Sequence, residues 1–426
     1  MITSIVIVFL LGYLLITLEN EIKINKAAIA LITGVLCWVI YILGVPEAHI
    51  VNDQLLEHLS DISSILFFLI GAMTIVELVD AHDGFDLITN NIKQTKKTQL
   101  LWLIGFLTFF LSAMLDNLTT TIVMVSLLRK LITHKEDRLL FIGIVVIAAN
   151  AGGAWTPIGD VTTTMLWIGG QISTVSIMSK LFLPSLITLL IPLIILSFSM
   201  KGSIENRKVP ILEDKLKLSR RKRIFMLITG VIALISVPIF KLYTHLPPFM
   251  GMLLGLGIMW VITELLHIKA DDERKKKLTL VYVLKKVDIS SLLFFLGILL
   301  AVAAMESSKI LPQAALWLSN KIGNESLIVM TIGILSSIVD NVPLVAATQG
   351  MYTLFQYPMD SYMWTFMAYS AGTGGSILII GSAAGVAAMG LEKIDFFWYV
   401  KKISWLALLG FFAGAFTFML LNYLFF

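Results

Sequence analysis

Two acid–amide pairs stand inside long apolar stretches of this chain. Asp116-Asn117 interrupts the apolar run 100–125, and Asp340-Asn341 occupies a similar place near the other end, preceded by Ser336. An ionisable side chain is costly at membrane depth, so a residue of this kind is a functional-site candidate by default. Two such acids in matching surroundings predict a duplicated ion site.

Each pair is followed by a second apolar segment that a glycine-rich stretch interrupts. The first interruption, NAGGAWTPIGD at 150–160, contains three glycines, a proline and an aspartate; the second has glycines at the same offsets in 374–381. Ser382 replaces Asp160 there, so the second break has fewer side-chain oxygens. Glycine lets backbones approach closely, and the carbonyl end of a half-helix carries partial negative charge. Both stretches therefore predict broken helices that suit a cation.

These residue types point to sodium and proton chemistry. A sodium ion needs several oxygen ligands at once, and we predict Na⁺ ligation by Asp116, Asn117, Asp160, Asp340 and Asn341. Desolvation disfavours a charged carboxylate and a nearby cation favours it, so Na⁺ and H⁺ can compete for the same acids. The whole set predicted to bind a cation or proton is Asp116, Asn117, Asn150, Thr156, Asp160, Thr162, Thr163, Ser336, Asp340, Asn341, Ser370 and Ser376.

The same polar residues also have structural interpretations. Asp160 is a candidate N-cap for a helix that restarts at Val161, and the two tip acids can cap helices in the same way. Threonines next to the tips and breaks can hydrogen-bond to carbonyls one turn earlier. Asp61 and Asp288, at the starts of apolar spans, are interpreted as caps, and the six histidines as surface residues.

Composition identifies an all-α polytopic membrane protein. Of the 426 residues 58% are hydrophobic and only 14% are charged, whereas soluble domains carry about a quarter charged residues. Apolar runs long enough to cross a bilayer recur along the chain. Cys37 is the single cysteine, and no P-loop, zinc-spaced Cys/His cluster or nucleophile–base pair is present. We therefore expect neither an enzyme nor a cofactor; the expected partners are the lipid bilayer and transported ions, with no nucleic acid.

The apolar pattern divides the chain into two repeats. The segment 61–69 matches 288–296 at eight of nine positions, and each half contains a hairpin followed by a broken span. We predict a first repeat at 1–200, a basic cytoplasmic linker at 201–223 and a second repeat at 224–426. The predicted elements are spans at 2–18, 27–44, 62–79, 181–200, 224–243, 249–267, 288–306 and 403–425, re-entrant hairpins at 99–128 and 326–355, and broken spans at 139–169 and 363–391.

Five crossings per half make the second repeat inverted relative to the first. Placing both termini outside puts all of the 32 Lys and Arg residues in cytoplasmic loops except Lys180, Lys241, Lys309 and Lys321. This follows the positive-inside rule, and the predicted location is a bacterial inner membrane. Inverted repeats with broken helices place substrate and ion sites near the bilayer midplane, which predicts a transporter that works by alternating access.

The motifs resemble those of NhaD-type sodium/proton antiporters, in the ion transporter superfamily that also holds arsenite permeases and dicarboxylate symporters. The matching stretches are LDNLTTT at 115–121, NAGGAWTPIGDVTTT at 150–164, VDNVPL at 339–344 and GTGGS at 372–376. The resemblance implies electrogenic exchange of Na⁺ or Li⁺ for H⁺ at alkaline pH, and a homodimer. It also implies functional roles for the tip and break residues named above, with Ser370 a rival to Ser376.

Other functions remain open at this point. A sodium-coupled symporter of a small organic anion, or another oxyanion permease of the superfamily, is the main alternative. The absence of Lys and Arg from the tips and breaks argues against it, as does Asp-Asn in place of the Ser-Asn-Thr tip of dicarboxylate carriers. A cation channel is a second alternative, against which the closed hairpins and paired breaks argue.

Overall fold

A computed structural model describes residues 1–17, 19–85, 87, 94, 96–200, 202–204, 218–267, 278–338 and 340–425. Within these ranges the regular structure is helical, with one isolated β-bridge between Lys96 and Ser203. Nine of the described helices are long and apolar enough to cross a membrane. The prediction of an all-α polytopic membrane protein is thus confirmed. Most of the predicted basic linker at 201–223 lies outside the described residues.

The helices follow the predicted order in both halves. The first half contains α1 (Ile2–Thr17), α2 (Glu19–Ile22), α3 (Lys26–Leu43), α4 (Ala48–Ala81), α6 (Lys97–Leu115), α7 (Asn117–Leu131), α8 (Lys135–Ala154), α9 (Val161–Ile168) and α10 (Thr174–Ser199). The second half contains α11 (Arg220–Thr244), α12 (Pro248–Leu266), α14 (Leu280–Leu284), α15 (Ile289–Ser307), α16 (Ile310–Ile322), α17 (Glu325–Leu335), α18 (Asn341–Met351), α19 (Tyr362–Gly374), α20 (Ala383–Glu392), α21 (Phe396–Tyr399), a π-helical turn η1 (Val400–Ser404) and α22 (Trp405–Phe425).

Helix α4 differs from the sequence-based expectation, and so do the short helices α2, α14, α16 and α21, which were not predicted. Helix α4 begins at Ala48 rather than at residue 62, because the polar stretch 48–61 contains neither glycine nor proline to stop a helix. Asp61 therefore lies inside α4, and its interpretation as a cap was wrong, whereas Asp288 does cap α15 by accepting from the Ser291 N–H at 3.1 Å.

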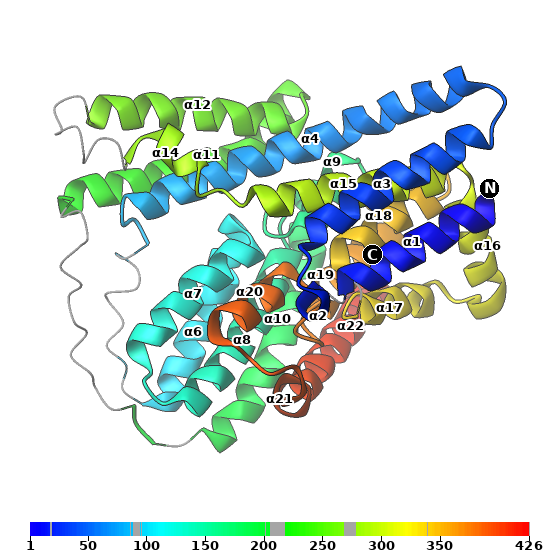
Figure 1. Ribbon diagram of the computed structural model, residues 1–426. Helices are drawn as coiled ribbons and strands as arrows, with labels where there is room; N and C mark the ends of the chain where they lie inside the picture. The colour runs from blue at the N-terminus through cyan, green and yellow to red at the C-terminus, as the bar shows by residue number, and fades with distance from the viewer. Residues whose placement is uncertain are drawn as a thin grey trace.

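The helices pack in two groups, which Figure 1 shows as an upper and a lower layer. In the upper group α3 packs against α1 and α15, and α4 packs against α11, α12 and α15. In the lower group α8 packs against α6, α7 and α10, while α10 also contacts α22 and α17 contacts α19. Helix α18 contacts α15 of the first group and α9 and α19 near the second. It therefore lies between the groups.

A histidine pair joins α4 to α12 just beyond the ends of both helices. The Nε2 atoms of His82 and His267 are 3.0 Å apart, and the two side chains are 0% and 3% exposed. The His82 Nδ1–H donates to the Leu78 carbonyl at 2.7 Å. Both histidines are buried, so the expectation that every histidine lies on the surface was wrong.

Candidate functional site

The first hairpin is formed by α6 and α7, which pack against each other and join at Asp116. Asp116 has φ 129° and ψ 161°, a strained conformation for a residue with a side chain. Its carboxylate accepts hydrogen bonds from the Thr119 backbone N–H at 2.7 Å and from the Thr119 hydroxyl at 2.8 Å. The predicted break is confirmed at this residue. Asp116 also caps α7, so its interpretation as a cap is confirmed, while its role in ion binding stays a prediction.

The first broken helix brings Asp160 to this hairpin. Helix α8 ends at Ala154 and α9 restarts at Val161, with Asp160 as its N-cap. Asp160 Oδ1 accepts from the Thr162 N–H and hydroxyl, each at 2.9 Å. Its other oxygen accepts from the Asn117 amide at 2.6 Å, and the same amide nitrogen donates to Asn150 Oδ1 at 3.0 Å. Asn117 therefore connects the hairpin tip to both sides of the break.

The predicted threonines around this break are buried and donate to carbonyl groups. The Thr156 hydroxyl donates to the Ala113 carbonyl at 2.7 Å, and Thr163 to the Asp160 carbonyl at 2.9 Å. The Thr162 hydroxyl donates to the Asp160 carboxylate rather than to a carbonyl group. Each hydroxyl oxygen keeps lone pairs, and the buried Thr120 and Thr121 hydroxyls have no hydrogen-bond partner among the described residues. The region is rich in oxygens with acceptor capacity left.

The second tip lies between α17, which ends at Leu335, and α18, which begins at Asn341. The Ser336 hydroxyl donates to the Gly333 carbonyl at 2.7 Å and contacts the Ala371 carbonyl of α19 at 3.3 Å. Asp340 precedes α18 but makes no cap hydrogen bond to it. Asn341 is 2% exposed, and its amide nitrogen has no partner among the described residues. The acid–amide pair of this tip makes fewer hydrogen bonds than the pair of the first tip.

The second broken helix contacts the first one directly. Helix α19 ends at Gly374, and α20 restarts at Ala383 with Ser382 as its cap. The Ser382 hydroxyl oxygen accepts from the Asn150 amide at 2.9 Å, which joins the two breaks. Ser376 donates to the Thr373 carbonyl at 2.7 Å, whereas the buried Ser370 hydroxyl has no partner among the described residues.

The structure gathers the two predicted tips and breaks into one buried polar cluster. Asp160 lies within electrostatic range of both Asp116 and Asp340. The Asn150–Ser382 hydrogen bond makes the two halves contribute to the same cluster. All twelve predicted site residues belong to these tips and breaks and are buried or nearly so. Two separate sites are therefore not needed to explain the two acid–amide pairs.

The cluster also contains a cation that the sequence did not place there. Lys26 Nζ lies 3.6 Å from Asp340 Oδ2, with side-chain exposures of 20% and 14%. Lys26 was predicted to lie in a loop, with no Lys or Arg at a tip or break; the second prediction was wrong in space, although correct along the chain. The available signal was position, because Lys26 opens an apolar helix directly after Asn25, a capping residue.

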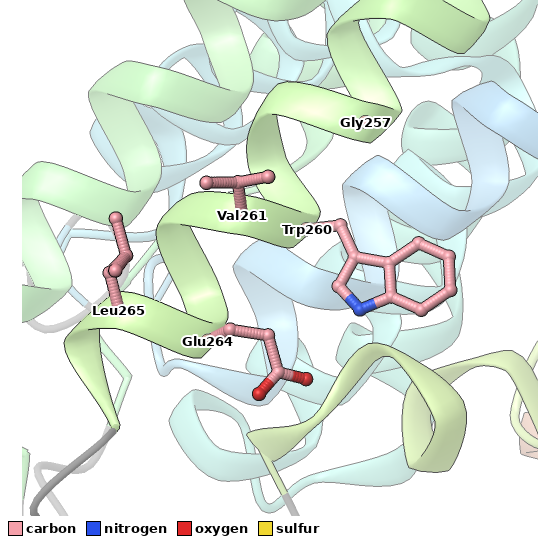
Figure 2. A pocket seen from close by; sticks show the side chains of 5 residues that line it. All are labelled: Gly257, Trp260, Val261, Glu264 and Leu265. Atoms are coloured by element: carbon pink, nitrogen blue, oxygen red, sulfur yellow. The ribbon is translucent and has the colours of Figure 1, made fainter.

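A pocket of about 330 Å³ lies elsewhere, on α12 (Figure 2). It is lined by Gly257, Trp260, Val261, Glu264 and Leu265, and three of these side chains, Trp260, Val261 and Leu265, are 42–63% exposed. In Figure 2 the side chains of Val261 and Leu265 lie to the left of those of Trp260 and Glu264, and the spacing of the lining residues places them all on one face of α12. Apart from the Glu264 carboxylate the pocket lining is apolar, whereas a sodium ion needs several oxygen ligands at once.

A multi-pass helical protein with two broken helices meeting at buried carboxylates has the architecture of secondary transporters. The chain belongs to the citrate transporter family, whose sequence model matches residues 13–372. Over 410 residues it is 51% identical to sodium/proton antiporter 1 of Arabidopsis thaliana, covering 96% of this chain and 70% of the relative. Sodium/proton antiporter 2 of the same plant is 49% identical over 416 residues, covering 97% and 98%.

Bacterial relatives show the same likeness at greater distance. The Na⁺/H⁺ antiporter NhaD of Vibrio cholerae is 30% identical over 448 residues, which cover 98% of this chain and 91% of the relative. The resemblance to NhaD-type antiporters that the motifs indicated is thereby confirmed.

Proposed function

We propose that this protein exchanges Na⁺ or Li⁺ for H⁺ across the membrane by alternating access. The observation that carries the proposal is the single polar cluster in which Asp160 lies within electrostatic range of both Asp116 and Asp340. Several buried carboxylates close together cannot all remain charged unless cations or protons neutralise them. Sodium ions and protons are then alternative occupants, which is the requirement for exchange. The names of the relatives support the same function.

The Asn117 amide suggests how the cluster accepts a cation. Its nitrogen donates to Asp160 Oδ2 and Asn150 Oδ1, two oxygens with the right chemistry to ligate sodium. A cation bound between these oxygens replaces the amide hydrogens. Asn117 then turns its own carbonyl oxygen inward and becomes a further ligand. In this proposal Asp160 is the central ligand, with Asp116 and Asp340 completing the charge balance.

The inverted repeat is part of the proposal, and matched backbone contacts support it. A Cβ at Gly152 of α8 would clash with the Phe109 carbonyl of α6, and one at Gly374 of α19 would clash with the Gly333 carbonyl of α17. Both breaks thus press against their own hairpin through a glycine. We retain the repeats at 1–200 and 224–426, the re-entrant hairpins, and both termini outside a bacterial inner membrane as proposals. The homodimer stays a prediction.

Everted membrane vesicles with a pH-sensitive dye test the function. We expect NaCl and LiCl to dissipate an imposed proton gradient, and citrate to have no effect. Asp160→Asn should reduce the Na⁺ response at least about a hundredfold because it removes a buried charge from the ligand set, and Asp116→Asn and Asp340→Asn should also abolish exchange. Asp53→Asn, an exposed acid near the start of α4, is the matched control.

Two results would contradict the proposal. Sodium-dependent uptake of labelled citrate without proton exchange would favour the anion symporter. A normal Na⁺ response in Asp160→Asn vesicles, with the protein present at the wild-type level, would remove the buried cluster from the mechanism.

A further inference from the structure

The Lys26–Asp340 pair connects parts of the molecule that are far apart in sequence. Lys26 is the first residue of α3, and Asp340 is the tip residue before α18. The Nζ to Oδ2 distance of 3.6 Å is an ion pair, and neither side chain is more than one fifth exposed. Screening by water is weak at that burial, so the charge of Lys26 acts strongly on Asp340.

Neighbouring groups hold Lys26 in this position. Its ammonium lies over the Phe294 ring of α15, 4.4 Å from the ring centre, which is a favourable cation–π distance. Its backbone N–H donates to the Glu19 carboxylate at 3.0 Å, which fixes the first turn of α3. The buried Tyr13 of α1 also lies within electrostatic range of Asp340. Lys26 is thus positioned by the Phe294 ring of α15 and the Glu19 carboxylate of α2 rather than extended freely into solvent.

Asp340 also differs from the other tip acid in what it bonds to. Asp116 is hydrogen-bonded twice by Thr119 of its own helix, while Asp340 makes no cap hydrogen bond to α18. The carboxylate of Asp340 therefore depends on a charge partner from elsewhere. Lys26 supplies that partner, at a distance where a second cation on the same oxygen would be repelled.

We propose that Lys26 is a tethered cation that competes with Na⁺ for Asp340 and thereby sets the apparent affinity for sodium. This inference rests on the proposed function. When Na⁺ binds, it takes the carboxylate from the ammonium, and Lys26 remains over Phe294. When Na⁺ leaves, Lys26 returns and neutralises Asp340, so the tip does not carry an unpaired charge. Lys26 is a positioning residue, since it acts through Asp340. The other charged groups facing the pair are Glu19 and Asp160.

The test measures the KM and the kcat of sodium-dependent exchange in proteoliposomes for three variants. Lys26→Met removes the competitor and should lower the KM for Na⁺ about tenfold, because a neighbouring opposite charge changes carboxylate equilibria by at least that factor. Lys26→Arg keeps a permanent charge with more donors, and should leave the KM equal to or above the wild-type value. The control is Lys23→Met, which changes an exposed lysine in the same connection.

The outcomes distinguish this inference from the proposed function. If wild-type protein exchanges Na⁺ for H⁺ but Lys26→Met has an unchanged or higher KM, Lys26 is not a competitor and only this inference fails. If wild-type protein shows no exchange, the proposed function itself fails. If Lys26→Met does not yield folded protein, Lys26→Arg still decides, since a KM below the wild-type value would contradict competition.

Discussion

The two hairpin tips carry the same acid–amide pair but bond it in opposite ways. At the first tip, Asp116 is capped by Thr119 and Asn117 donates to Asp160 and Asn150. At the second, Asp340 has a lysine from another helix as its partner, and the Asn341 amide nitrogen has none among the described residues. The first tip is therefore built into its break by hydrogen bonds, whereas the second is held by charge.

The proposed ligands stand on both sides of the cluster, and the difference between the tips concerns how firmly each side is held. Hydrogen bonds are short-ranged and fix geometry, so the first tip with its break forms a rigid framework. An ion pair at 3.6 Å tolerates displacement, so the second tip can exchange partners more readily. We interpret the first half as the frame of the site and the second as its adjustable side.

Replacing the two asparagines tests this comparison with the largest expected effect. Asn117→Ala leaves Asp160 Oδ2 and Asn150 Oδ1 without their donor, and should lower the free energy of unfolding by about 2–4 kcal/mol, since each unsatisfied buried group costs roughly 1–3 kcal/mol. Asn341→Ala removes an amide nitrogen that is already unbonded, and should cost under about 1 kcal/mol. Unfolding in mixed micelles measures both. Equal losses in the two variants would contradict the proposed division between frame and adjustable side.

Glu392 forms ion pairs that join the two halves of the chain away from the tips. Its replacement is a second test, with a smaller expected effect. Glu392 ends α20, and its side chain, 3% exposed, pairs with Arg129 of α7 and with Arg138, 3.0 Å away. Burial alone would raise the pKa of Glu392, but hydrogen bonds from Arg129 and Arg138 outweigh it and hold the pKa below its ordinary value. Glu392→Gln should lower the free energy of unfolding by about 1.5–3 kcal/mol at neutral pH.

The pH dependence of this loss follows from the direction of the shift. A lowered folded-state pKa stabilises the fold above the ordinary pKa, and that stabilisation disappears as the pH falls through the folded-state value. The difference between wild type and Glu392→Gln should therefore shrink in acid, as measured by unfolding at several pH values. Glu136→Gln, an exposed acid at the start of α8, is the control. A difference that grows in acid would show that the pair does not stabilise the charged form.

The smallest effect is expected at Ser382. Ser382→Ala removes the N-cap of α20 and the acceptor for the Asn150 amide, and should lower the free energy of unfolding by about 1 kcal/mol. Ser382→Thr keeps the hydroxyl and should be close to wild type. If alanine and threonine behave alike, the link between the breaks contributes no stability. This would leave the first break independent of the second.

The features that could be predicted from the sequence are those that depend on neighbouring residues. The breaks at Asp116 and at 155–160 were predictable because glycine, proline and capping acids act on their immediate neighbours. Asp61 and Asp288 stand at the starts of closely similar apolar spans, so both were interpreted as helix caps. Only Asp288 follows a non-helical segment and caps its helix, whereas Asp61 lies inside α4. The local pattern is the same at both positions, and the residues before it determine whether the helix begins there.

Contacts between residues far apart in the chain could not be predicted from the sequence. Nothing near Lys26 along the chain indicates Asp340, and nothing near His82 indicates His267. The joining of the two breaks through Asn150 and Ser382 is likewise a property of the packed helices. The predicted site residues were thus identified by type, while their union into one cluster and the added lysine required the fold.

The Asn150–Ser382 hydrogen bond has a consequence for how the protein is made. The two residues are separated by 232 positions, and ribosomes add about 5–20 residues per second. Asn150 therefore waits roughly 10–50 s after its own synthesis before its partner exists. During that interval the Asn150 oxygen can accept from Asn117, but its amide nitrogen lacks the acceptor that Ser382 supplies. The hydrogen bond that joins the two breaks therefore forms late in synthesis, and a chain released before Ser382 would lack it.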